Sequence, residues 1–153
     1  MSTKPEPMSA SGRDVVPVTA RPVSDTPARF EVDGIVVAAS TRVVGEIVER
    51  FGALDMVVNN AGIATFSPID ADDYEDHWAL GIEVLLTAQT RVIRAALPHL
   101  RRSDCARIVN ISSTEGWGAT KFGSPYTAAK HGVIGLTKSL AVELGREGIT
   151  VNC

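Results

Sequence analysis

The sequence predicts an α/β fold, in which helices flank a parallel sheet on both faces. Two short apolar runs, at residues 56–59 and 107–111, are typical of buried strands. They alternate with longer segments whose apolar residues recur at helical spacing, and this alternation without internal repeats is typical of a parallel sheet. The chain has 153 residues, of which 44% are hydrophobic, so it has room for one domain with its own core.

Three helices are predicted from the spacing of apolar residues. The first ends at Gly52 and carries its apolar stripe on Val43, Val44, Ile47, Val48 and Phe51. The second follows the acidic residues 70–73 and runs to about Leu97, with Pro98 near its end. The third runs from Pro125 to Leu144, with Ser124 as its predicted N-cap and an inward face formed by Ala129, Val133, Leu136, Leu140 and Leu144.

The N-terminal part of the chain differs in composition from the rest. Residues 1–29 hold five of the eight prolines, with serine, threonine and charged residues between them. Such a composition predicts a disordered segment over residues 1–29, followed by one domain over residues 30–153. The segment lacks the apolar stretch of a secretory signal peptide.

Ser113, Tyr126 and Lys130 are the candidate chemical groups. Tyr126 and Lys130 are four residues apart at the start of a predicted helix, so they share one face. A nearby ammonium and the helix N-terminus both favour a phenolate, which makes Tyr126 a candidate general acid/base. Ser113 ends the second predicted strand, where its hydroxyl could hold a carbonyl oxygen. Taken alone, a tyrosine and a lysine at this spacing are more often an ordinary surface pair.

Three motifs in order resemble the short-chain dehydrogenase/reductase family. They are the segment 55–62 (DMVVNNAG), the segment 107–113 (RIVNISS) and Tyr126-x-x-x-Lys130. The resemblance runs from about residue 40 to Cys153. It implies a partial Rossmann-like doubly wound parallel sheet, and an oxidoreductase that interconverts a carbonyl and an alcohol with NAD or NADP.

The resemblance also implies a role for each candidate residue. Tyr126 would be the general acid/base, Lys130 would favour its phenolate and bind the nicotinamide ribose, and Ser113 would polarise the substrate carbonyl. A turn that lies beside the cofactor in the family corresponds to Asn60, Ala61 and Gly62. A purely structural turn that supports the sheet is the alternative for these three residues.

The sequence departs from the family pattern at three places. Leu85 occupies the position of an asparagine that helps to hold a water on the active-site lysine, and a leucine side chain cannot form hydrogen bonds. A backbone carbonyl could still hold this water. The first 58 residues lack the glycine-rich turn that receives the cofactor pyrophosphate, and no substrate-covering segment follows Cys153. We therefore expect an incomplete domain that binds NAD(P) weakly.

In the family, the strand at residues 56–59 has a neighbour that this sequence lacks, so the strand is expected to have an open edge. The β-branched run Ile35-Val36-Val37 predicts a strand over residues 34–39, and the segment 30–38 is the candidate to cover that edge. A further strand is predicted to begin within residues 148–153.

Charge and composition limit the classes of partner. A net charge of −3 gives no reason to expect nucleic acid, and no apolar run reaches the length of a membrane span. Two cysteines without C-x-x-C spacing and three scattered histidines predict no metal site. We expect a cytoplasmic protein with a small-molecule carbonyl or alcohol substrate. Homo-oligomers are expected through the helices at 71–97 and 125–144, by the family resemblance. The alternative function is a noncatalytic remnant that acts by associating with full-length relatives.

Overall fold

The computed structural model describes the backbone of residues 32–153 and the side chains from Ala39 onward. It contains a parallel sheet of three strands in the order β1-β2-β3. The strands are β1 (Met56–Asn59), β2 (Arg107–Asn110) and β3 (Thr150–Asn152). In the register of the sheet, Val57 is opposite Ile108, and Ile108 is opposite Val151. The predicted α/β class and the predicted final strand are confirmed, whereas the prediction for residues 1–29 lies outside the described residues.

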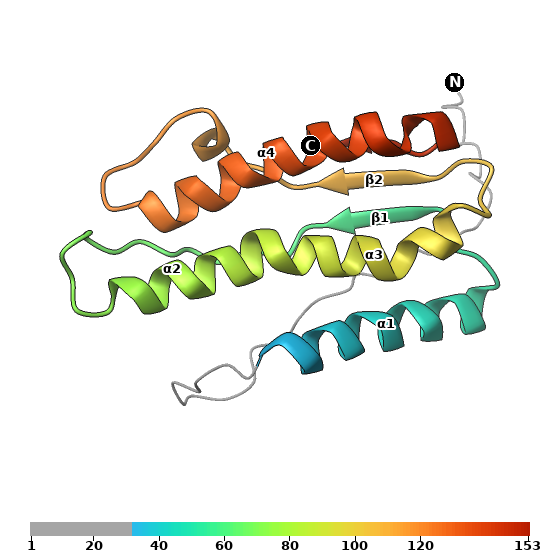
Figure 1. Ribbon diagram of the computed structural model, residues 1–153, viewed down its shortest axis with the longest axis horizontal. Coiled ribbons are helices and arrows are strands. Elements are labelled where there is room, and N and C mark those ends of the chain that lie inside the picture. Colours follow the sequence, from blue (N-terminus) through green and yellow to red (C-terminus); the bar gives the residue numbers. More distant parts are fainter. Residues whose placement is uncertain (1–31) are drawn as a thin grey trace, which may run out of the picture.

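Helices connect the strands and lie side by side along the sheet (Figure 1). They are α1 (Val32–Phe51), α2 (Tyr74–Ile82), α3 (Ala88–Leu100) and α4 (Ser124–Leu144). A single π-helical turn, η1 (Glu83–Thr87), joins α2 and α3 into one continuous rod, and short 3₁₀ turns form η2 (Thr114–Gly116) and η3 (Gly145–Glu147). The second predicted helix is therefore present, but it contains a π turn that the sequence pattern did not indicate.

The strand predicted over residues 34–39 is wrong, because this stretch belongs to α1. No proline interrupts the chain between residue 32 and Phe51, and the helix ends where Gly52 adopts a left-handed φ of 79°. A helix that is already nucleated extends at little cost, so it includes three β-branched residues despite their strand preference. Within the described residues β1 pairs with β2 alone, and its other edge stays open.

The hydrophobic core lies between one face of the sheet and the helices α1, α3 and α4. Val57, Ile108 and Val151 occupy matching positions on that face, and they pack against residues of the three helices. The helical contributors are Val44, Ile93, Ala96, Leu100 and Leu144. On the opposite face Met56 and Val58 are about half exposed, so the helices described here cover one face of the sheet and not both faces, as the sequence pattern had predicted.

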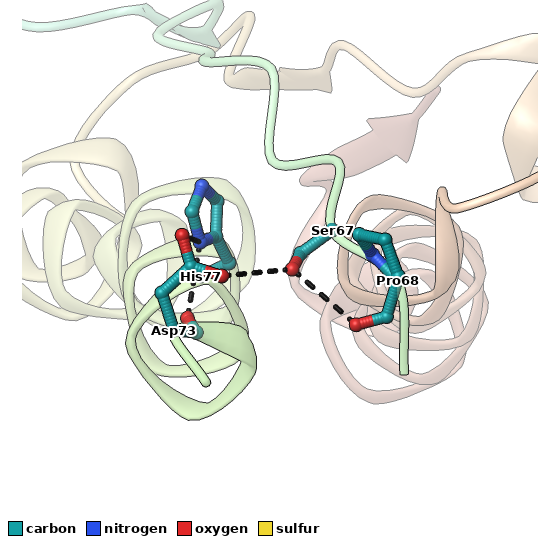
Figure 2. Close-up of polar contacts among 4 residues, drawn as sticks. All are labelled: Ser67, Pro68, Asp73 and His77. Carbon is teal, nitrogen blue, oxygen red and sulfur yellow. Dashed lines mark hydrogen bonds and ion pairs between the residues drawn. The ribbon is translucent and has the colours of Figure 1, made fainter. Parts of the chain in front are cut away.

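The segment between β1 and α2 is held in place by side-chain hydrogen bonds at the start of α2 (Figure 2). The Ser67 hydroxyl lies 3.2 Å from Oδ1 of Asp73, the N-cap residue of α2, and Nδ1 of His77 lies 3.1 Å from the Asp73 carbonyl oxygen. The Ser67 N–H also donates to the Phe122 carbonyl at 2.8 Å. The side-chain contacts fix the end of this loop on α2, and the Ser67–Phe122 bond joins it to the loop that precedes α4.

Candidate active site

The candidate site lies where the carboxyl ends of β1 and β2 meet the first turn of α4. Parallel strands end at one edge of the sheet, and ligands of open α/β folds bind beyond that edge. A shallow cavity of about 420 Å³ is present there. Ser113 and Tyr126 both line it, together with Gly62, Ile63, Ala64, Phe66 and Glu115.

Ser113 lies three residues after the end of β2 and is the N-cap of η2. Its backbone is extended, with φ −160° and ψ 166°, and its Oγ accepts the N–H of Glu115 at 3.2 Å. A serine hydroxyl has two lone pairs and one proton, so this bond leaves the proton available for a ligand. Ser113 lines the cavity, and the contact of its hydroxyl with a ligand stays a prediction.

Tyr126 lies in the first turn of α4, where its ring stacks on Phe66 with centroids 5.8 Å apart and an interplanar angle of 18°. The helix begins one residue earlier than predicted. Gly123 is the N-cap, and Ser124 is the first helical residue, so the N-cap prediction for Ser124 is wrong. The Ser124 hydroxyl lies 2.9 Å from the hydroxyl of Tyr74 and caps no backbone N–H of α4.

Lys130 lies one turn after Tyr126 on the same face of α4. Its Nζ is 5.5 Å from the centroid of the Tyr126 ring and donates a hydrogen bond to the Ile111 carbonyl at 2.8 Å. The side chain is only 4% exposed, and this burial lowers the pKa of Lys130 because the apolar surroundings disfavour its charged form. The ammonium is therefore fixed between the end of β2 and the tyrosine ring.

The turn after β1 is exposed on the same edge of the sheet. Of Asn60, Ala61 and Gly62, only Gly62 lines the cavity. A Cβ added at Gly62 would meet Leu85 Cδ2 at 3.7 Å, an ordinary contact, so the described residues leave room for a side chain there. The role of this turn in holding a cofactor stays a prediction.

Leu85 is fully buried in the π turn beside Gly62. Its carbonyl oxygen accepts a hydrogen bond from Gln89 Nε2 at 2.8 Å. That a backbone carbonyl holds the water on the lysine stays a prediction. The side chain itself contributes only apolar surface behind the cavity.

The sequence reasoning missed a buried polar chain that joins β1, β2 and α4 beneath the site. The Asn59 side chain donates to Asn110 Oδ1 at 2.8 Å, and the Asn110 side chain donates to Thr137 Oγ1 at 3.0 Å. All three side chains are buried, and Asn110 has no exposed surface. The signal was present in the sequence, because each of the two strands ends in an asparagine and the two asparagines align in register.

Gly116 was also missed, although it determines how closely η2 approaches α4. A Cβ at this position would lie 2.6 Å from Ile134 Cδ1 and 3.1 Å from the Lys130 carbonyl oxygen. Only glycine avoids both contacts, so Gly116 allows the turn that carries Ser113 to lie directly on the helix that carries Tyr126 and Lys130.

Glu115 was missed as well, and it has a charged side chain at the cavity. Its Oε1 accepts from the Thr120 hydroxyl at 2.6 Å, and its Oε2 accepts from the Thr127 hydroxyl at 2.9 Å. These two hydrogen bonds lower the pKa of Glu115, because they stabilise the carboxylate. No sequence motif marked it, since its partners come from two different segments.

Among residues with described side chains, no three histidine, cysteine or acidic residues lie close enough together to bind a metal ion. In the helices that the structure describes, none is long and apolar enough to cross a membrane.

A parallel α/β sheet with a serine and a tyrosine on one cavity at its carboxyl edge defines a Rossmann-like class of protein. The sequence pattern of the short chain dehydrogenase family matches residues 25–153. The chain belongs to the short-chain dehydrogenase/reductase family.

Individual relatives agree with this membership. The chain is 42% identical over 106 residues to a D-beta-hydroxybutyrate dehydrogenase of Rhizobium meliloti (strain 1021), and the match covers 69% of this chain and 41% of that protein. It is 40% identical over 117 residues to a monensin polyketide synthase putative ketoacyl reductase of Streptomyces virginiae, covering 75% of this chain and 44% of that one. A crystal structure of a short chain dehydrogenase from Mycobacterium smegmatis superposes with a TM-score of 0.69 at 39% identity, over 76% of this chain and 48% of the other. The chain thus spans less than half the length of these relatives.

Proposed function

We propose that Ser113, Tyr126 and Lys130 form the active site of an oxidoreductase that interconverts a carbonyl and an alcohol. The observation that carries the proposal is that Ser113 and Tyr126 line one cavity while the Lys130 ammonium lies against the tyrosine ring. Reduction of a carbonyl requires a hydride and a proton for the developing alkoxide, and a phenol beside a hydroxyl donor suits the second requirement. The dehydrogenase and reductase names of the relatives support the same reaction class.

Each residue has a separate task in the proposed mechanism. Ser113 donates a hydrogen bond to the substrate oxygen and fixes its position. Tyr126 donates its proton to that oxygen during reduction and accepts it during alcohol oxidation. Lys130 favours the phenolate through its positive charge. A nicotinamide, when bound, supplies or accepts the hydride.

The cofactor we propose is NAD or NADP. The cavity, the exposed turn at Asn60, Ala61 and Gly62, and the ammonium of Lys130 suit the nicotinamide end of such a molecule. In residues 32–58 the glycines at positions 34, 45 and 52 are widely scattered and form no glycine-rich turn before a helix, so this described part of the chain shows no cradle for the pyrophosphate. We therefore expect this chain to bind NAD(P)(H) with a Kd of about 1 mM or weaker, roughly −4 kcal/mol. Titration calorimetry that gave a micromolar Kd would contradict this expectation.

Replacement of the phenol tests the proposed mechanism. Tyr126→Phe should lower turnover by roughly 10²- to 10⁴-fold, the usual contribution of a general acid/base. Tyr74→Phe is the matched control, because it removes the only other tyrosine hydroxyl, which bonds Ser124 and does not line the cavity. Lys130→Ala should recover part of its activity at high pH in alcohol oxidation, whereas Tyr126→Phe should not. Near-normal turnover of Tyr126→Phe would refute the assignment.

The alternative proposal is a noncatalytic chain that acts by associating with full-length relatives. Two observations favour it: Leu85 supplies no side-chain hydrogen bond behind the cavity, and β1 has one unpaired edge among the described strands. An unpaired edge favours the addition of another strand. If the alternative holds, the chain lacks turnover with saturating cofactor but co-sediments with a full-length family member.

We also propose that the protein is a homo-oligomer located in the cytoplasm. An apolar cavity of about 600 Å³ lies beside α2 and the start of α4, and the exposed Ile69, Trp78 and Phe122 line it, which supports pairing through these helices. Cys105 and Cys153 are both exposed and form no disulfide, which suits a reducing compartment. A stable monomer in sedimentation at tens of micromolar protein would contradict the oligomer.

A further inference from the structure

Glu115 carries a negative charge at the cavity that contains the Ser113 hydroxyl and the Tyr126 phenol. Besides Ser113, Tyr126 and Glu115, the cavity is lined by four apolar or small residues, and Glu115 is the one lining residue with an ionisable carboxyl group. No lysine or arginine forms an ion pair with Glu115 in the part of the chain that the structure describes. Lys130, the ammonium of the proposed site, is not among the residues that line the cavity, and its Nζ donates to the Ile111 carbonyl.

The carboxylate is also held rigidly. Thr120 and Thr127 donate to its two oxygens from the loop before α4 and from the first turn of α4. A carboxylate offers about four acceptor positions, so these bonds leave capacity for a ligand that donates hydrogen bonds. The same bonds stabilise the ionised form and keep the pKa of Glu115 low, so the charge is present at neutral pH.

We propose that Glu115 selects substrates by charge: the cavity disfavours carbonyl compounds that carry a carboxylate close to the reacting carbon, and favours neutral compounds or ones that present a hydrogen-bond donor there. The inference rests on the proposed oxidoreductase function, because it assigns the substrate class of the same site. Its physical basis is that an anion entering the cavity meets a fixed like charge, and charge juxtaposition of this kind acts on specificity by excluding wrong ligands.

A matched pair of ligands tests the selection. Acetoacetate and methyl acetoacetate present the same ketone, but only the first carries a carboxylate. Their Kd values for the 153-residue chain are measured from the amide NMR shifts of the cavity residues, without need for turnover. We expect the ester to bind more tightly, and we expect Glu115→Gln to narrow the ratio of the two Kd values by about three- to tenfold, the range for one partly exposed charge. Glu49→Gln removes a charge from the exposed face of α1 and should leave the ratio unchanged.

Several outcomes would overturn the selection. A purely positioning role of Glu115 would weaken both ligands by the same factor and leave the ratio constant. A change of less than about twofold in the ratio of the two Kd values in Glu115→Gln would also contradict selection by charge. The wild-type chain provides a test that requires no variant. Raising the salt concentration from 20 to 500 mM shortens the Debye length by about 80%, so it should screen the Glu115 charge and narrow the ratio of the two Kd values. A ratio that does not respond to salt refutes the selection.

The two proposals fail in different ways. Turnover of the ester together with an unchanged ratio in Glu115→Gln refutes charge selection and leaves the oxidoreductase. A ratio that changes as expected, with no turnover of either ligand at saturating cofactor, refutes the oxidoreductase and leaves a cavity that discriminates by charge.

Discussion

The hydrogen-bonded chain of Asn59, Asn110 and Thr137 should contribute strongly to stability, and Asn110→Leu removes its central member. Two buried hydrogen bonds are lost, each worth a net of about 0.5–1.5 kcal/mol. The Asn59 amide then loses its acceptor while it stays only 8% exposed, which adds about 1–3 kcal/mol. Thr137 keeps its bond to the Val133 carbonyl, so it adds little. Because the leucine recovers some apolar burial, we expect a net loss of about 2–4 kcal/mol.

Urea denaturation followed by circular dichroism measures this loss. The melting temperature should fall in parallel, by about 4 °C for each kcal/mol in a domain of this size. The control is Asn152→Leu, which makes the same replacement at an exposed strand position and should change stability by less than about 0.5 kcal/mol. In a double-mutant cycle, Asn59→Leu should cost about 1 kcal/mol less in the Asn110→Leu background than alone. A loss below about 0.5 kcal/mol for Asn110→Leu would show that the chain of hydrogen bonds does not stabilise the fold.

Three further predictions concern packing and charge around the site. Gly116→Ala should destabilise the protein by about 1–3 kcal/mol in urea denaturation, because the new methyl group clashes with Ile134 Cδ1. Ile134→Val removes that atom, so the double variant should recover part of the loss. If the stability losses of the two single variants simply add in the double variant, the clash is contradicted. Leu85→Ala should lower the free energy of unfolding by about 2–5 kcal/mol in the same measurement, because the side chain is fully buried. Val142→Ala, at a site that is 84% exposed, should lower it by less than about 0.5 kcal/mol, and equal losses for the two variants would refute this reasoning. Burial lowers the pKa of Lys130, so between that pKa and the ordinary value near 10.5 the unfolded state binds more protons than the folded state. The free energy of unfolding of the wild type, compared with that of Lys130→Met, should therefore rise with pH just below 10.5. If the urea midpoints of the two proteins change with pH in the same way, the burial of the ammonium has no effect on stability.

The sequence was sufficient for the class of fold and for most of its helices. The period of apolar residues predicted α1 as far as Gly52 and α4 to Leu144, because in both cases burial and helix propensity favour the same structure. The pattern failed at residues 34–39, where β-branched residues suggested a strand but the helix simply extends through them. It also could not predict the π turn at Glu83–Thr87, because one added residue in a long apolar helix leaves no mark in composition.

The candidate site was predictable only in part. The spacing of Tyr126 and Lys130 predicted their shared face, and the end of an apolar run placed Ser113 at the edge of the sheet. Glu115 could not be found this way, because its position depends on hydrogen bonds from residues 120 and 127, which only the folded loop brings together. The contact that requires Gly116 is likewise a property of packing between η2 and α4.

The π turn between α2 and α3 sets the rotational phase of the whole rod. An α-helix turns by about 100° per residue, so one extra residue in the turn rotates everything beyond it by that angle. Before the turn, α2 packs against α4, and after it α3 packs against α1 and the sheet. Deletion of a single residue within 83–87 would therefore direct Ile93, Ala96 and Leu100 away from the core. One turn of backbone thus lets a single helix serve two layers of the protein, with the tyrosine-bearing helix on one side and the sheet on the other.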